Sequence, residues 1–340
     1  MKILVIGPSW VGDMVMAQSL FILLRQLHPN AEIHVLAPAW SQALLAHMPE
    51  VAGSIEMTVG HGELQLGKRR AIARQVRAGG FDQAIVLPNS FKSALIPWFA
   101  GIPRRTGWRG EARSLLLNDC RILDPRLYPL MVERFAALAL APGGVLPAQL
   151  PRPALQVSAQ TTMSALARLG LDTHSPALVL CPGAEFGAAK KWPASSYAAV
   201  SDHWLQQGGQ VWILGSANDG KDAGAIMAGL PQHRRDHCRD LAGKTTLADA
   251  VAVMAAASAV ISNDSGLMHV AAALARPLVV VYGSTSPAFT PPLADQVRSI
   301  SLGLGCSPCF KRVCPLGHTD CLNKLAPGLV IDALRELALP

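Results

Sequence analysis

A carboxylate closes the first turn of the chain. The apolar stretch KILVIG runs into GPSWVGD, which ends on Asp13 where an amphipathic helix begins. In a cofactor-binding protein such a turn holds phosphate on backbone N–H groups. Asp13 would repel a diphosphate, but it suits a hydroxyl group that must lose a proton. We interpret Asp13 as a general base; the alternative is that it only caps a helix beginning at Met14.

Two lysines precede a later helix. In AAKKWP, Lys190 and Lys191 stand just before a helix that opens at Pro193. A lysine ammonium is a point charge that suits the phosphates of a bound ligand. No D-x-D triplet that would hold a metal ion against such phosphates occurs in the sequence. Lys190 is therefore the first candidate and Lys191 the second, the alternative being ordinary surface lysines.

The stretch NDSGLMH is a second candidate site for binding an anion. Asp264 ends a predicted strand, and Ser265 and Gly266 open a helix whose free N–H groups favour negative charge. The Asp264 carboxylate could bind hydroxyl groups of a ligand, and His269 follows one turn later. The alternatives are that Asp264 is an N-cap and that His269 is an ordinary buried histidine.

Positive charge is concentrated in the first half of the chain. Residues 1–165 hold 16 Lys and Arg against 10 Asp and Glu, whereas residues 166–340 hold 14 against 13. Such a surface attracts an anionic partner. Nucleic acid is the weaker choice because no nucleic-acid-binding motif accompanies the charge. The candidates for binding an anionic acceptor are Lys92, Arg104, Arg105 and Arg109, unless they are merely exposed.

A run of cysteines lies near the end of the chain. Cys306, Cys309, Cys314 and Cys321 form a C-x2-C-x4-C-x6-C pattern that also contains His318. Thiols at such spacings in a cytosolic protein favour a tetrahedral zinc site over disulfides. A structural zinc ion is therefore one expectation, and reduced thiols or a redox-labile pair are the others.

Composition bounds the class of protein. Of 340 residues, 50% are hydrophobic and 16% are charged, which is typical of a globular protein and excludes disorder. Pro, Gly, Ser or Thr interrupt the long uncharged stretches, so none predicts a membrane-spanning helix. No signal peptide pattern follows Lys2, and we expect a cytoplasmic protein.

Strands and helices alternate in two series. Apolar runs at 2–7, 32–38 and 81–90 predict strands, with helices at 14–28 and 39–48 between them. A Pro- and Gly-rich segment at 141–155 precedes the second series, whose predicted strands are 177–183, 210–216, 259–265 and 278–284. The order predicts an α/β protein with two Rossmann-like domains facing a cleft, 1–165 and 166–325, and a C-terminal helix in 326–340 that packs back toward the N-terminal domain.

Two common nucleotide motifs are missing. The turn G-P-S-W-V-G after the first strand lacks one glycine of the G-x-G-x-x-G fingerprint, and CPGAEFG in the second half does not match it either. A Walker A pattern, G-x-x-x-x-G-K-[ST], does not occur. NAD-dependent enzymes and P-loop NTPases are therefore disfavoured.

Four motifs in sequence order carry a family resemblance. GPSWVGDMVMAQSL, the segment VLPNSFKSALIPWFAGIPRRTGWRGEAR, CPGAEFGAAKKWP, and NDSGLMHVAAAL with VYGSTSPAFTPP resemble the ADP-heptose:lipopolysaccharide heptosyltransferases over residues 1–300. The resemblance implies an inverting GT-B glycosyltransferase, with an N-terminal acceptor domain and a C-terminal nucleotide-sugar domain. It implies Asp13 as the catalytic base, Lys190 against the phosphates, and Asp219 in GSANDG near the ribose.

The resemblance also implies the partners. They are ADP-heptose as donor, the lipopolysaccharide inner core (Kdo-lipid A bearing the first heptose) as acceptor, and the cytoplasmic face of the inner membrane, where the enzyme would be peripheral. No cofactor or metal ion would be required for catalysis. Two other hypotheses stay open: a sister transferase with a different donor or acceptor, and a two-domain nucleotide-sugar-binding protein without turnover.

Overall fold

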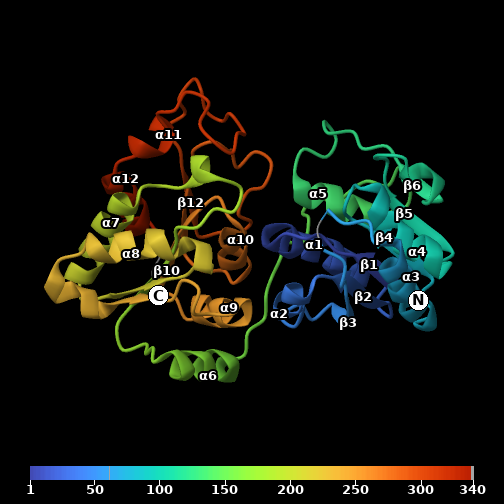
Figure 1. Ribbon diagram of the computed structural model, residues 1–340, viewed down its shortest axis with the longest axis horizontal. Helices are drawn as coiled ribbons and strands as arrows, with labels where there is room; N and C mark the ends of the chain where they lie inside the picture. Colours follow the sequence, from blue (N-terminus) through green and yellow to red (C-terminus); the bar gives the residue numbers. More distant parts are fainter. Residues whose placement is uncertain (61, 338–340) are drawn as a thin grey trace. The chain divides into compact units, whose positions relative to one another are not determined.

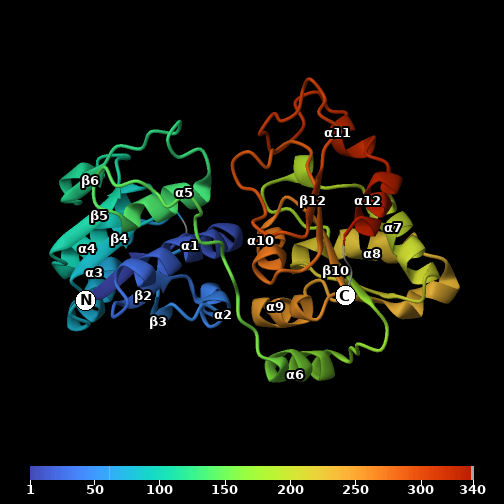
Figure 2. The ribbon, with the colours of Figure 1, turned by 180° about the vertical axis from the view of Figure 1, so that it is seen from behind.

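The structure is a computed structural model that describes residues 1–60 and 62–337. The chain divides into two units, Met1–Pro153 and Ala154–Pro340 (Figure 1). Each unit holds one six-stranded parallel sheet with helices on both faces (Figures 1 and 2). The α/β class predicted from the alternating pattern is confirmed.

The sheet of the first unit has the strand order β3-β2-β1-β4-β5-β6. Chain order reverses between β1 and β4, and the crevice outside their carboxyl ends is where α/β sheets of this kind bind ligands. The strands are β1 (Lys2–Ile6), β2 (Glu32–Ala37), β3 (Val51–Glu56), β4 (Gln83–Val86), β5 (Arg104–Trp108) and β6 (Asp119–Arg121).

Alternation along the strands decides which helices cover each face of this sheet. Leu4 and Ile6 of β1 belong to one buried cluster with residues of α3 and α4. Val5 points to the opposite face, where α1 packs with α5. The helices are α1 (Val11–Leu27), α2 (Gln42–Leu45), α3 (Leu66–Ala78), α4 (Leu95–Ala100) and α5 (Met131–Ala136).

The second sheet repeats the same topology. Its order is β12-β11-β10-β7-β8-β9, so the reversal falls between β7 and β10. The strands are β7 (Ala177–Cys181), β8 (Gln210–Ile213), β9 (Cys238–Asp240), β10 (Ala259–Asn263), β11 (Leu278–Val281) and β12 (Val297–Ile300). The helices are α6 (Ala159–Leu169), α7 (Ala194–Gln206), α8 (Gly220–Ala228), α9 (Leu247–Ala255), α10 (Gly266–Ala273), α11 (Asp320–Asn323) and α12 (Pro327–Arg335).

The domain boundaries differ from those expected at 165 and 325. The division falls after Pro153, because α6 packs on α9 and so belongs to the second unit. The expectation that residues 326–340 pack back toward the N-terminal domain stays a prediction. Helix α12 packs on α7, β11 and β12, where Val330 and Leu334 are buried in the core of the second unit; residues 338–340 lie outside the described residues.

Within residues 1–60 and 62–337, every helix falls short of the length and apolarity that crossing a bilayer requires.

Candidate active site

The turn after β1 places Asp13 inside the first turn of α1. Trp10 is extended and acts as the N-cap, and the amide of Met14 donates to the carbonyl of Trp10 over 2.9 Å. The helix therefore begins at Val11, three residues before the expected start. Asp13 is not the cap of this helix, so that alternative is wrong. Its charge lies at the positive end of the helix dipole.

The Asp13 carboxylate is desolvated. Burial raises the pKa of Asp13 to about 6. No hydrogen bond or ion pair engages this carboxylate within the part of the chain that the structure describes. The group is ionised at neutral pH, yet it binds a proton about 100-fold more tightly than an ordinary aspartate. A carboxylate of this kind is suited to proton abstraction.

Lys92 and Arg109 belong to the same edge of the first sheet. Lys92 lies in a short 3-10 turn, Phe91–Ala94, that follows β4, and Arg109 follows β5 directly. Arg109 is exposed and Lys92 is half-buried. Neither forms an ion pair among the residues described. Both cations are thus available near the carboxyl ends of the strands, where an anionic substrate would bind.

Arg113 joins the loops that follow β4 and β5. Its Nε and Nη2 donate to the carbonyl of Trp108 at 2.8 and 2.6 Å, and its Nη1 donates to the carbonyl of Pro88 and to Ser93 Oγ. Burial lowers the pKa of Arg113 to about 10, which leaves it charged at neutral pH. The sequence interpretation missed this residue, because nothing in the sequence distinguishes a buried arginine from exposed ones nearby.

Arg104 and Arg105 do not join this edge, which separates them from Lys92 and Arg109 among the predicted acceptor-binding residues. Both begin β5, so they lie at its amino end, on the opposite edge of a parallel sheet. Arg104 Nη2 pairs with Asp119 Oδ2 at 3.0 Å. Arg105 donates from Nε to the carbonyl of Leu116 and from Nη1 to that of Ile102, at 2.7 and 2.5 Å. Both guanidinium groups therefore stabilise the fold.

In the second unit, Lys190 and Asp264 meet at the carboxyl ends of β7 and β10. Lys190 Nζ lies 2.6 Å from Asp264 Oδ2 and 3.3 Å from the Asp264 carbonyl oxygen. The side chains are 14% and 7% exposed, so the pair is largely buried. Because the Asp264 carboxylate turns to Lys190 and Ser265 is the N-cap, the alternative of Asp264 as a helix cap is wrong.

Lys191 points to a different place. Its Nζ lies 2.7 Å from Asp222 Oδ2 and 3.3 Å from Asp219 Oδ1. Asp219 is buried and accepts hydrogen bonds at Oδ2 from the backbone N–H and hydroxyl of Ser216, which closes the turn before α8. Of the two lysines, Lys190 is therefore the one near the N-terminus of α10.

The N-terminus of α10 carries three of the predicted donor-binding residues. Ser265 is its N-cap, but the hydroxyl contacts Ser262 Oγ at 3.2 Å and does not cap the helix. Gly266 is the first helical residue, so its N–H is one of the N-terminal groups that lack a partner within the helix. His269 is buried, and desolvation lowers its pKa to about 4. It is thus neutral at pH 7 and adds no positive charge.

Further residues at this edge escaped the sequence interpretation. The Phe186 ring, on the loop after β7, lies 4.9 Å from Lys190 Nζ and 5.5 Å from the Arg312 guanidinium carbon. After β11, the hydroxyls of Ser284 and Thr285 are buried and have no hydrogen-bond partner among the described residues. The stretch YGST after a strand was a signal that could have identified the two hydroxyl residues.

The chain is similar to proteins of known family along its whole length. The model of glycosyltransferase family 9 (heptosyltransferase) matches residues 69–320. The chain is 49% identical over 344 residues to lipopolysaccharide heptosyltransferase 2 of Escherichia coli K12, covering 100% of this chain and 99% of that protein. It is 44% identical over 345 residues to lipooligosaccharide heptosyltransferase 2 of Haemophilus influenzae, covering 99% of each.

A solved structure agrees with these relatives. The structure of E. coli ADP-heptose lps heptosyltransferase II superposes with a TM-score of 0.90 at 47% identity, over 98% of both chains. Its fold is the two-sheet GT-B arrangement that the sequence motifs imply. The chain therefore belongs to glycosyltransferase family 9, the heptosyltransferases.

Proposed function

We propose that this enzyme transfers heptose from ADP-heptose to the first heptose of the lipopolysaccharide inner core, with inversion at the anomeric carbon. Family membership and the E. coli relatives of 49% and 47% identity support the donor and the pathway. The observation that carries the chemistry is the unpaired, desolvated carboxylate of Asp13 beyond the carboxyl end of β1.

Asp13 serves the acceptor. It removes the proton of the acceptor hydroxyl while the hydroxyl oxygen forms a bond to the anomeric carbon, and the bond from that carbon to the ADP oxygen breaks with its electron pair leaving on ADP. The raised pKa of Asp13 makes this proton transfer more favourable than it would be for an ordinary carboxylate.

Lys190 and the N-terminus of α10 serve the leaving group. The lysine and the free backbone N–H groups oppose the negative charge that grows on the diphosphate. Fixed charges of this kind replace a metal ion in the catalytic step. Asp264 holds the ammonium of Lys190 in position and offers its second oxygen to hydroxyl groups of the donor.

Turnover with defined acceptors tests this proposal. Purified enzyme with ADP-heptose will release ADP when the acceptor is Kdo-lipid A bearing one heptose, and not when that heptose is missing. Equal rates with both acceptors would indicate a sister transferase. Binding of ADP-heptose without ADP release from either would indicate a binding protein.

Two substitutions test the proposed binding of the acceptor. Lys92→Ala and Arg109→Ala will each raise the KM for the acceptor about tenfold or more, because each removes a charged hydrogen-bond donor for carboxylate or phosphate. Arg104→Ala is the matched control, since its guanidinium lies at the opposite edge of the sheet. A larger rise in KM for Arg104→Ala than for Arg109→Ala would contradict this placement.

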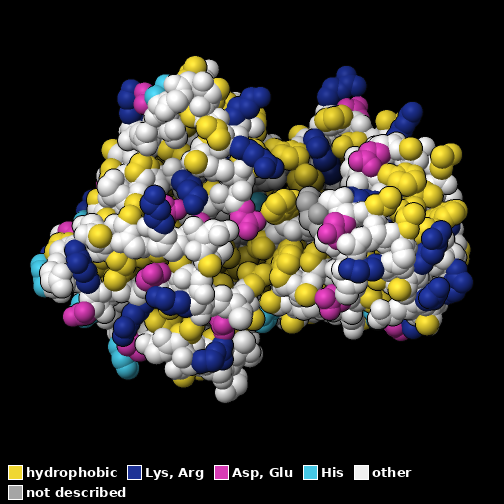
Figure 3. Space-filling model, viewed as in Figure 1, with side chains coloured by type: hydrophobic (Ala, Val, Ile, Leu, Met, Phe, Trp, Pro, Cys, Tyr) yellow, Lys and Arg dark blue, Asp and Glu magenta, His cyan; other side chains and the backbone are white. Residues whose placement is uncertain are grey.

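Lipid A anchors the acceptor, and we propose that the enzyme binds the inner membrane peripherally from the cytoplasm. Helix α3 carries the exposed side chains of Lys68, Arg70 and Arg74 and no acidic residue. Arg70 stacks on Phe99 of α4 at 4.8 Å, next to the 45% exposed Trp98. Figure 3 shows Lys and Arg side chains beside apolar ones on this unit. Such a mixed surface suits anionic headgroups.

Vesicle sedimentation checks the membrane surface. The enzyme will bind vesicles containing phosphatidylglycerol, and Lys68→Ser with Arg74→Ser will weaken this about tenfold or more, at about 1 kcal/mol per basic residue. Lys221→Ser, an exposed lysine of the second unit, is the control. Equal binding to vesicles of phosphatidylcholine alone would refute an electrostatic contact.

A further inference from the structure

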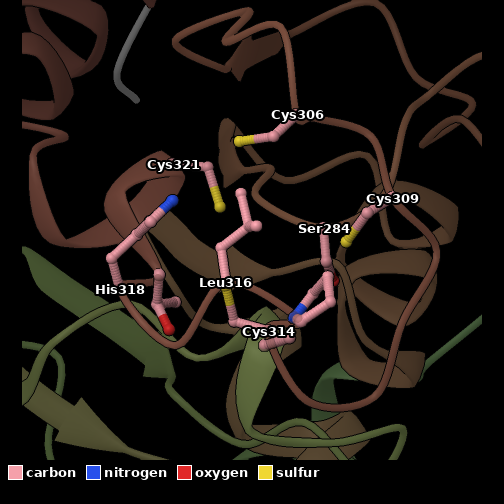
Figure 4. Close-up of a pocket in the computed structure, with 10 residues that line it drawn as sticks. Ser284, Cys306, Cys309, Cys314, Leu316, His318 and Cys321 are labelled. Carbon is pink, nitrogen blue, oxygen red and sulfur yellow. The ribbon is translucent and has the colours of Figure 1, made fainter.

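Four thiols surround one small cavity in the second unit. The loop between β12 and α12 places Cys306, Cys309, Cys314 and Cys321 around it (Figure 4). The cavity volume is about 20 Å³, which is enough for one water molecule or one ion. Besides the cysteines, the lining residues are Ala189, Ser284, Pro315, Leu316, His318 and Thr319.

The cysteines approach the cavity from different stretches of the loop. Cys306 is exposed, Cys309 and Cys314 are half-buried, and Cys321 is buried in the first turn of α11. All four are free thiols. Within the described ranges, no three His, Cys, Asp or Glu side chains are already arranged to hold a metal ion. The four thiols thus line the cavity without converging on one point, and binding an ion requires their side chains to reorient toward it.

Residues 314–317 form a tight turn that carries Cys314 at the edge of the cavity. Gly317 has a φ of 74°, which favours glycine, and its N–H donates to the Cys314 carbonyl at 3.1 Å. This backbone hydrogen bond fixes the turn and therefore the direction in which the Cys314 side chain leaves it.

His318 also lines the cavity, but its ring is engaged elsewhere. Its Nδ1 accepts a hydrogen bond from the backbone N–H of Asp320 at 2.9 Å. In the neutral ring the proton then lies on Nε2, so neither nitrogen has a free lone pair for a metal ion. The four sulfurs therefore remain as the ligands for a metal ion.

We propose that Cys306, Cys309, Cys314 and Cys321 bind one zinc ion in a closed, structural site. Four thiolates form the tetrahedral set that zinc prefers, with no position left for water. The four S–H groups release their protons as four Zn–S bonds form, and no oxidation or reduction takes place. The site is separate from the catalytic step, which uses fixed charge.

The zinc loop supports the donor site, a step that rests on the proposed function. The amide of Ala189, next to Lys190, donates to the carbonyl of Arg312 at 3.1 Å, and the amide of Phe310 donates to the carbonyl of Ser284 at 2.7 Å. Gly187 lies so close to the Arg312 backbone that a Cβ would stand 2.3 Å from its carbonyl oxygen. A metal ion that orders residues 306–321 thereby orders the Lys190 loop.

Elemental analysis of the full chain, purified without chelators, tests the site. We expect about one zinc per chain, and cobalt substitution should give the intense sulfur-to-cobalt absorption of a four-thiolate site. Cys309→Ser with Cys314→Ser will lose nearly all of the metal, whereas Cys120→Ser in the first unit and His318→Ala will keep it. Metal far below one equivalent, also after incubation with zinc under reducing conditions, overturns the proposal.

Two other outcomes are equally informative. One equivalent of iron would overturn zinc as the ion, and loss of metal in His318→Ala would overturn the four-sulfur ligand set. Since metal content is measured without turnover, zinc in an inactive protein would refute the proposed function and leave the site standing. If the proposed function and the zinc site are both correct, Cys309→Ser with Cys314→Ser will bind ADP about tenfold more weakly by calorimetry, and Cys120→Ser will bind it as the unmodified enzyme does.

Discussion

Replacing Asp13 by Asn will lower kcat about a thousandfold or more while ADP-heptose still binds. The variant keeps the size of the side chain but cannot accept a proton, and a positioned general base contributes about 10²–10⁴-fold. Steady-state kinetics with the heptose-bearing acceptor measure the loss, and calorimetry with ADP measures the binding. An Asp13→Asn enzyme with unmodified turnover would contradict the assignment.

The pH profile identifies the group responsible. Asp13 acts only when ionised, so kcat/KM of the unmodified enzyme will rise about tenfold per pH unit below pH 6 and level off above it, following the raised pKa of about 6. The residual activity of Asp13→Asn will lack this limb. A limb that persists unchanged in the variant would mean that another group titrates there.

Stability separates loss of chemistry from loss of folding. The folded pKa of Asp13 lies above its unfolded value, so the ionised carboxylate destabilises the fold at pH values above about 6, and this penalty vanishes below about pH 4. Asp13→Asn will therefore be more stable than the unmodified enzyme at pH 7.5, by at most about 3 kcal/mol of unfolding free energy, and will unfold at a higher temperature there. At pH 4 the two proteins will unfold at nearly the same temperature. A gain in stability at pH 7.5 that disappears at pH 4 would show that the Asp13 carboxylate is desolvated in the folded enzyme.

The sequence was sufficient for the elements that are apolar throughout. Apart from Lys2, strands β1, β7 and β11 are continuous apolar runs, and helices such as α9 have clear apolar periodicity, so the doubly wound topology could be predicted. Strand β5 has the sequence RRTGW, and β9 only CRD, so pairing with neighbours rather than hydrophobic pattern makes them strands. Such strands depend on tertiary structure.

The same contrast applies to the site. Asp13 follows a buried strand of the first sheet, and Lys190 and Asp264 follow buried strands of the second. A parallel sheet brings the carboxyl ends of its strands to one edge, so each residue could be assigned to that edge of its own sheet. Arg104 and Arg109 are five residues apart, and only the course of β5 between them assigns one to each edge. The sequence shows that both residues are charged. Because β5 could not be predicted from its sequence, nothing assigned the two arginines to opposite edges of the sheet.

Replacing Lys190 by Ala will lower kcat/KM for ADP-heptose about 10²–10³-fold. The ammonium lies at the N-terminus of α10, where it opposes charge that develops on the diphosphate in the transition state. Lys191→Ala is the matched control, because its ammonium pairs with Asp219 and Asp222 instead. We expect less than a tenfold effect there, measured as ADP release at limiting donor.

The variant also leaves a carboxylate buried without its cation. Removing one partner of a buried pair destabilises a fold by about 3–5 kcal/mol, so Lys190→Ala alone confounds folding with catalysis. Lys190→Met with Asp264→Asn removes both charges and will restore most of the unfolding temperature without restoring turnover. Two results would contradict binding of the diphosphate by Lys190 at the N-terminus of α10. One is a double variant that recovers both the unfolding temperature and turnover, and the other is a larger loss of kcat/KM in Lys191→Ala than in Lys190→Ala.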